Sequence, residues 1–281
     1  MNVLVERLIC GPTVADELSA RAQIIARLFN TVIDVERSGL RVLQCRGYYR
    51  DENPSSFGLV YEILGPKTIP ITLRQLIKDT SRERSSRPDL GDLFELATKV
   101  VRCILEVHRI GWVHRSISSY NILFPPDSTS QIVPLRSPYL IGFNHCREDA
   151  WLAFTQALNA DLHINQLRYQ HPEYVRMAHG YRPEYDFYSV GVVMLEIGRW
   201  RTLSQLTSFK KGERRTINKP NEIREILVNE CEQNLGSSMG AQYRNAVRAC
   251  LTSDFITNRG GDELRNDFER KVLNQLTKCR A

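Results

Sequence analysis

One stretch of the 281-residue chain gathers side chains whose types and spacing could do chemistry. It runs from Trp112 to Phe124 and ends in three apolar residues typical of a buried strand. Histidine, arginine and asparagine can hold or orient a polar reacting group, but no carboxylate lies among them. A serine hydroxyl without a lowered pKa cannot accept a proton at neutral pH as a carboxylate does. The polar members of interest are His114, Arg115, Ser116, Ser118 and Asn121.

The order of these residues resembles the catalytic loop of protein kinases, in which a His-Arg-Asp triplet and an Asn are separated by four residues. His114, Arg115 and Asn121 match that pattern. Ser116 takes the place of the Asp that orients the attacking hydroxyl, and Ser118 takes the place of the Lys that steadies the transferred phosphate. The resemblance therefore implies a kinase-like fold in which no catalytic residue set is intact.

A second match lies at Tyr139–Asn144, which resembles the apolar strand before the kinase Asp-Phe-Gly motif. Phe143 is kept, but Gly142 replaces the Asp that is the main protein ligand of the phosphate-bridging Mg²⁺. Hard divalent cations prefer anionic oxygen, and glycine offers no side chain. Asn121 could still ligate a metal, although one neutral amide oxygen makes a poor Mg²⁺ site. We therefore expect no metal or cofactor, with ATP and Mg²⁺ as the alternative, and expect the Asn121 amide to hold the loop backbone.

Two further motifs resemble the scaffold of a kinase rather than its chemistry. The His-Pro-Glu at 171–173 resembles Ala-Pro-Glu, and the run 186–191 resembles the Asp-x-Trp/Tyr-Ser-x-Gly that opens the central helix of the large lobe. The resemblance implies that the Glu pairs with an arginine of a late helix, for which Arg259 and Arg265 are candidates. It also implies that the Asp caps the backbone of the catalytic-loop stretch. These scaffold residues are His171, Pro172, Glu173, Asp186 and Gly191.

Hydrophobic spacing predicts the helices that carry these motifs. Leu90–His108 is the clearest long helix, because its apolar residues fall on one face and its charged residues on the other, and Gly111 follows as a stop signal. A short helix is expected at Leu73–Asp79. In the last third, the same spacing predicts helices over Glu222–Glu230, Ala241–Thr252 and Asp262–Cys279. Between the motifs, residues 147–170 match the kinase activation segment in position. They include Thr155 and Tyr169, and a phosphorylation site there is an alternative to an ordinary ordered loop.

The first 64 residues resemble a truncated small lobe. Strands are expected at Asn2–Glu6, Leu40–Gly47 and Ser56–Leu64, and a helix at Asp16–Val35. The third strand of a kinase small lobe ends in a Lys that holds the ATP phosphates, and here Glu6 stands in that place. No lysine precedes Lys67, and a Gly-rich loop is missing. An ion pair of Glu6 with Arg21 or Arg27 is one alternative, and Glu62 falls where the hinge between lobes would lie.

Composition limits the class of protein. With 42% hydrophobic and 25% charged residues, the chain has enough apolar content for a globular protein of one large domain or two lobes. The kinase resemblance implies an α+β, bilobal kinase-like fold, with a small, truncated β-rich lobe at 1–64 and a mainly helical lobe at 65–281. Seven scattered cysteines indicate reduced thiols and a cytoplasmic protein. No targeting or transmembrane segment is visible. We expect protein partners and no nucleic acid, and the basic run 199–215 leaves peripheral membrane contact as an alternative.

Several longer stretches resemble a fungal family of kinase-like domains associated with prion-inhibition-and-propagation (HeLo-type) proteins and linked to incompatibility and cell-death signalling. They include 41–49, 57–61, 169–174 and 195–201. Three hypotheses follow: a catalytically inactive pseudokinase acting as a signalling or scaffold module, a weak or atypical Ser/Thr kinase that uses substitutes such as Glu62 or Asp127, and a metal-independent nucleotide sensor.

Overall fold

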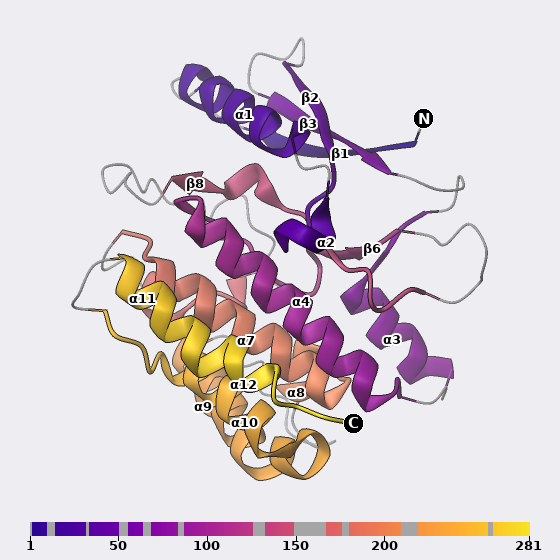
Figure 1. Ribbon diagram of the computed structural model, residues 1–281, viewed down its shortest axis with the longest axis vertical. Helices are drawn as coiled ribbons and strands as arrows, with labels where there is room; N and C mark the ends of the chain where they lie inside the picture. The colour runs from indigo at the N-terminus through magenta and orange to yellow at the C-terminus, as the bar shows by residue number, and fades with distance from the viewer. Residues whose placement is uncertain are drawn as a thin grey trace.

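The chain folds into a mixed α/β structure in which small antiparallel sheets accompany a large set of helices (Figure 1). The computed structural model describes residues 2–9, 15–31, 34–50, 56–63, 69–83, 87–125, 133–148, 167–175, 180–208, 219–257 and 261–281. The strands are β1 (Asn2–Ile9), β2 (Cys45–Arg50), β3 (Ser56–Ile63), β4 (Ile71–Thr72), β5 (Trp112–Val113), β6 (Ile122–Phe124), β7 (Tyr139–Leu140) and β8 (Arg147–Glu148).

The helices are α1 (Ala15–Asn30), α2 (Val35–Ser38), α3 (Leu73–Glu83), α4 (Leu90–Arg109), α6 (Pro172–Val175), α7 (Pro183–Arg199), α8 (Leu203–Leu206), α9 (Pro220–Glu230), α10 (Gly236–Thr252), α11 (Gly261–Phe268) and α12 (Asn274–Leu276). A 3₁₀ turn, η2, covers Phe143–His145, and π-helical turns cover Cys231–Leu235 and Glu269–Leu273. None of the described helices is long and apolar enough to cross a membrane.

The first part of the chain forms an antiparallel sheet of order β1-β3-β2, and α1 packs on it (Figure 1). Apolar side chains of α1, among them Ile25 and Phe29, meet the buried face of β3. The helix expected to run through Val35 ends at Asn30 instead. Asp34 then caps a separate turn, α2, because its carboxylate accepts the Arg37 N–H at 2.9 Å.

One expected strand begins later than the sequence indicated. Residues 40–44 are not part of β2. Val42 bridges Leu140, and the Leu140 N–H donates to the Arg41 carbonyl at 2.8 Å, whereas the Gln44 carbonyl already accepts the Glu62 N–H of β3 at 3.0 Å. The strand expected over Tyr139–Asn144 is likewise limited to β7, since Gly142 turns into the left-handed region at φ 91° and starts η2. The first difference arises from a contact between segments about one hundred residues apart in the chain, and the second from the local backbone of Gly142.

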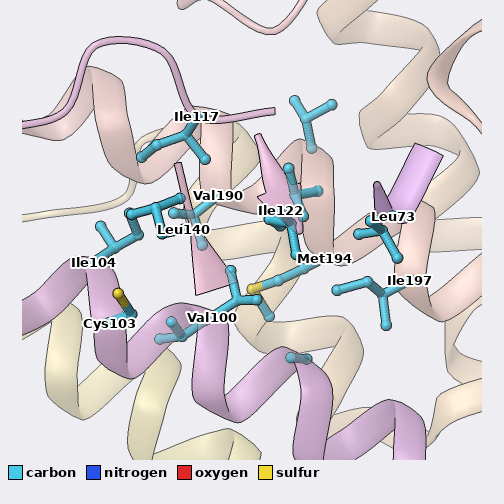
Figure 2. Packing of buried hydrophobic residues seen from close by; sticks show 14 of the residues in the cluster. Leu73, Val100, Cys103, Ile104, Ile117, Ile122, Leu140, Val190, Met194 and Ile197 are labelled. Atoms are coloured by element: carbon cyan, nitrogen blue, oxygen red, sulfur yellow. The ribbon is translucent and has the colours of Figure 1, made fainter. Parts of the chain in front are cut away.

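Helices α4 and α7 form the centre of the helical part. Side chains of α4 meet those of β6, β7 and α7 in one continuous core (Figure 2). Each such side chain stabilises the fold by about 1.5–3 kcal/mol as it leaves water. Gly191 of α7 lets α10 approach closely, because a Cβ atom there would lie 2.5 Å from the Cβ of Cys250.

The C-terminal helices follow the predicted segments with different boundaries. Helix α9 begins at Pro220, whose fixed φ suits the first helical position. Helix α10 contains the expected 241–252 helix but begins at Gly236 and is kinked at Gly240, where φ is 81°. The helix expected over Asp262–Cys279 is interrupted by a π-helical turn between α11 and α12.

Candidate functional site

Asp186, in the first turn of α7, organises the stretch that the sequence singled out. Its carboxylate is fully buried and accepts the N–H groups of His114 (2.7 Å) and Arg115 (2.8 Å), as the motif predicted. The Tyr181 hydroxyl donates to it at 2.6 Å, and His108 Nε2 at 2.9 Å. Burial acts to raise the pKa of Asp186, but the hydrogen bonds from His108 and Tyr181 oppose it, and the pKa is lowered. The carboxylate therefore stays ionised and fixes the loop backbone.

Arg115 adopts a backbone conformation that is unusual for a residue with a side chain. Its φ is 68°, in the left-handed region, which costs of the order of 1–3 kcal/mol for such a residue. Asp186 holds its N–H, and Gln170 donates to its carbonyl at 2.7 Å. The buried guanidinium donates to the Tyr174 hydroxyl at 2.8 Å and lies 5.3 Å from the ring centre of Tyr181. These contacts together maintain a strained loop, as is common at functional sites.

His114 is a buried neutral imidazole with both ring nitrogens engaged. Nε2 donates to the Ile141 carbonyl at 3.1 Å, and Nδ1 accepts the Ser116 N–H at 3.2 Å. Burial lowers the pKa of His114 to about 4, although the charge of Asp186 opposes the shift. At neutral pH His114 is therefore uncharged, and its single ring N–H joins the loop to the strand end at 141.

Asn121 lies against Ser116 and Gly142. Its amide nitrogen donates to the Ser116 carbonyl at 2.6 Å and to the Ser116 Oγ at 2.9 Å, so the amide holds the loop backbone as the sequence predicted. A Cβ atom on Gly142 would lie only 2.4 Å from Asn121 Nδ2. Neither Ser116 nor Gly142 supplies a carboxylate, and the Ser118 hydroxyl is buried without a hydrogen-bond partner among the described residues.

Glu6 reaches the same site from β1. Its partly buried carboxylate accepts the N–H groups of Gly142 (2.5 Å) and Phe143 (2.8 Å) and lies 3.5 Å from the Tyr61 hydroxyl. Burial raises the pKa of Glu6 to about 7, while these backbone N–H groups act in the opposite direction. The guanidinium of Arg21, the alternative partner of Glu6, donates to the Asn144 carbonyl at 3.1 Å. Glu6 is therefore bound to the backbone of the 142–143 segment.

Other predicted residues lie apart from this cluster. Glu62 is on β3 and forms an ion pair with Arg46 of β2. Because Glu6 pairs in register with Leu59, and side chains alternate along a strand, Glu62 points to the opposite face of the sheet. Asp127, Thr155 and Arg259 lie outside the described residues. In the run 199–215, only residues 199–208 are described, and there Arg199 is paired with Glu230 at 2.7 Å.

The His-Pro-Glu motif joins α6 to α7 and α10. Pro172 opens α6, and His171 stacks on Tyr185 with ring centres 4.6 Å apart. Glu173 is exposed and accepts the Tyr185 hydroxyl at 3.3 Å. Arg265 is not its partner, since that guanidinium pairs with an aspartate of α11 and reaches the His108 carbonyl at 3.4 Å. Arg265, one of the two candidates, therefore does not pair with Glu173.

A second buried carboxylate, Glu196 of α7, was not predicted as a site residue. It accepts Ser119 Oγ (3.1 Å), the Tyr169 hydroxyl (2.9 Å) and the Leu203 N–H (2.6 Å). Burial raises the pKa of Glu196 to about 7, and these donors oppose the shift. Tyr169 is itself buried, so its hydroxyl is closed to a modifying enzyme in this conformation. The sequence signal was an acidic residue inside the apolar run of α7.

Comparisons with known proteins agree with a kinase-like relationship. The chain is 29% identical over 119 residues to the probable serine/threonine-protein kinase fnkE of Dictyostelium discoideum. That match covers 42% of this chain and 8% of the relative, so the chain spans a small part of the relative's length. A family model described as Domain of unknown function (DUF7580) matches residues 32–275. Since this range includes most of the chain, the protein belongs to the DUF7580 family.

Proposed function

We propose that this chain is a bilobal protein-kinase-like domain, divided near residue 64, that acts as a pseudokinase: it binds protein partners without transferring a phosphoryl group. The observation that carries the proposal is the combination of an ordered loop with missing carboxylates. Asp186 and Asn121 hold the loop in place, whereas the residues at 116 and 142 are Ser and Gly. The scaffold is retained and the groups that would do chemistry are not.

The missing groups are those on which phosphoryl transfer depends. Catalysis of this reaction rests on positioning the reactants and on bound metal ions that stabilise the negative charge of the phosphates. A carboxylate normally ligates the metal. The described residues contain no group of three or more His, Cys, Asp or Glu side chains that could hold a metal ion. Asn121 directs its amide nitrogen, a donor, at Ser116. These features support binding or signalling over catalysis.

Thermal unfolding with and without ATP, each in Mg²⁺ and in chelator, tests the proposal. A ligand that binds only the native state at 100 times its dissociation constant stabilises it by about 2.7 kcal/mol, which is easily measured. We expect no shift in any condition and no phosphate incorporation from labelled ATP. A shift without metal would favour a nucleotide sensor, and a shift that needs Mg²⁺ together with phosphate incorporation would overturn the proposal.

One observation favours a second candidate, a weak or atypical Ser/Thr kinase: the partial identity with a probable kinase of that class. Phosphate incorporation that is lost in Asn121→Ala would support it, because Asn121 is the remaining polar side chain of the loop able to approach a metal-bound phosphate. A cytoplasmic role in fungal incompatibility or cell-death signalling, alongside a HeLo-type domain, rests on sequence resemblance. Co-purification of protein partners from fungal cells would test that role.

A further inference from the structure

The segment 141–145 lies between two parts of the molecule. Towards the helical part, the Ile141 N–H donates to the Asn121 carbonyl at 2.9 Å, and the Phe143 ring packs edge-on against His114 with centres 4.7 Å apart. The His114 ring also donates to the Ile141 carbonyl. The segment is therefore tied to the loop of residues 114–121 at several points.

Towards the sheet, the same segment is held by β1 and α1. The Asn144 side-chain amide donates to the Arg7 carbonyl at 3.1 Å, and Arg21 donates to the Asn144 carbonyl at 3.1 Å. The Phe143 ring meets Phe29 of α1 with centres 4.5 Å apart. The only negatively charged group among these described contacts is Glu6, which accepts the two N–H groups of residues 142 and 143. We call this pair of hydrogen bonds the Glu6 clasp.

The local backbone explains why one carboxylate can make both bonds. Gly142 is left-handed, with φ 91° and ψ 30°, and the following residues turn as a 3₁₀ helix. Successive N–H groups in such a turn converge on one point and form a concave donor site that suits an anion. Above the pKa of Glu6, which burial raises to about 7, its carboxylate is ionised, and hydrogen bonds from N–H groups to an ionised acceptor are about twice as strong as neutral ones. The clasp is therefore the strongest polar link between β1 and the 141–145 segment.

We propose that the Glu6 clasp is a coupling device: this one carboxylate keeps the 141–145 segment, and through it the loop of residues 114–121, fixed to β1 and α1. Without it the sheet and α1 open independently of the helical part. A small cavity lies beside the clasp and is bordered by Glu6, Arg21 and Asn144. The inference does not depend on whether the protein binds nucleotide.

Hydrogen exchange of the full chain, followed by mass spectrometry, tests the coupling at one constant pH above the pKa of Glu6, where its carboxylate is ionised. Glu6→Gln removes the charge and leaves the side-chain length unchanged. Because each bond to a charged acceptor contributes about 1.5–3 kcal/mol, we expect peptides from 2–9 and 141–148 to exchange about ten-fold faster or more. Peptides from α4 and α7 should keep their protection. Glu62→Gln is the matched control, since it removes one negative charge from the same sheet, on the face opposite the clasp.

Two results would overturn the proposal. The first is protection in Glu6→Gln equal to that in Glu62→Gln at both segments. The second is an equal loss of protection across all peptides, α4 and α7 included, which would make Glu6 an ordinary contributor to global stability. Glu6→Asp serves as a second variant if Glu6→Gln fails to fold, because it keeps the charge but is one methylene too short to reach both N–H groups. It should show the same regional loss.

Discussion

Replacing Gly142 by alanine tests the packing at the centre of the site. At φ 91° an L-residue is strained by about 1–2 kcal/mol. The new methyl group would also lie 2.4 Å from Asn121 Nδ2 and 2.7 Å from its Cγ, and such overpacking typically costs about 1–3 kcal/mol. Together the two effects lower the free energy of unfolding by about 2–5 kcal/mol. The same geometry means that a metal-binding aspartate cannot be restored at 142 unless Asn121 moves.

A double-mutant cycle separates the two contributions. Urea unfolding monitored by circular dichroism gives the free energy of unfolding for Gly142→Ala, Asn121→Ala and the double variant. In the Asn121→Ala background, the cost of the alanine at 142 should fall to the backbone strain alone, about 1–2 kcal/mol. Gly111→Ala is the matched control, because Gly111 has φ 80° and no atom within 4 Å of an added Cβ.

The reasoning fails if Gly142→Ala destabilises the protein no more than Gly111→Ala does. It fails equally if the cost at 142 is the same with and without the Asn121 side chain. Either result would mean that the Asn121 amide can move away from an added methyl group without lowering the free energy of unfolding. The absence of a side chain at 142 would then have no part in holding Asn121 against Ser116.

Three further changes have defined outcomes. Asp186→Asn leaves buried N–H groups without a charged acceptor and should lower the free energy of unfolding by about 2–5 kcal/mol in urea titrations. Gly191→Ala places a methyl group 2.5 Å from the Cβ of Cys250 and should cost about 1–3 kcal/mol, whereas Gly91→Ala, whose Cβ would meet its nearest neighbour at 3.7 Å, should be neutral or stabilising. Burial raises the pKa of Glu196 from 4.5 to about 7, so the folded state binds more protons than the unfolded chain between those values. Stability therefore falls as pH rises through that window, and Glu196→Gln, assayed by unfolding across the window, should reduce the slope; an unchanged slope would contradict the shift.

Local pattern was sufficient where structure depends on neighbours in sequence. The apolar stripe of Leu90–His108 predicted α4 to within one residue, and the motif at 186 predicted that an aspartate would hold the backbone of the 114–115 segment. The sequence pattern gave a wrong prediction where contacts between distant segments determine the local structure. Residues 40–44 have the composition of a strand, yet the backbone at Arg41 and Val42 pairs with Leu140, and nothing near them in the sequence indicates that partner.

The role of Glu6 illustrates the same limit at the site. Its position in an apolar run marked it as a replacement for a phosphate-binding lysine, but the N–H groups that donate to it depend on the left-handed turn at Gly142, 136 residues away. Glu196 was overlooked because its three donors come from Ser119, Tyr169 and Leu203, which meet only in the folded chain. Residue types suggested where charge would matter, and tertiary contacts decided what each charge does.

The buried cysteine next to the 141–145 segment gives the molecule a built-in chemical reporter. Cys146 is fully buried, and burial raises the pKa of its thiol well above the usual range, so an alkylating reagent finds neither access nor thiolate. Cys279, near the C-terminus, is partly exposed. The ratio of alkylation at these two thiols therefore measures how often the segment leaves its place, in the native sequence and without an added label.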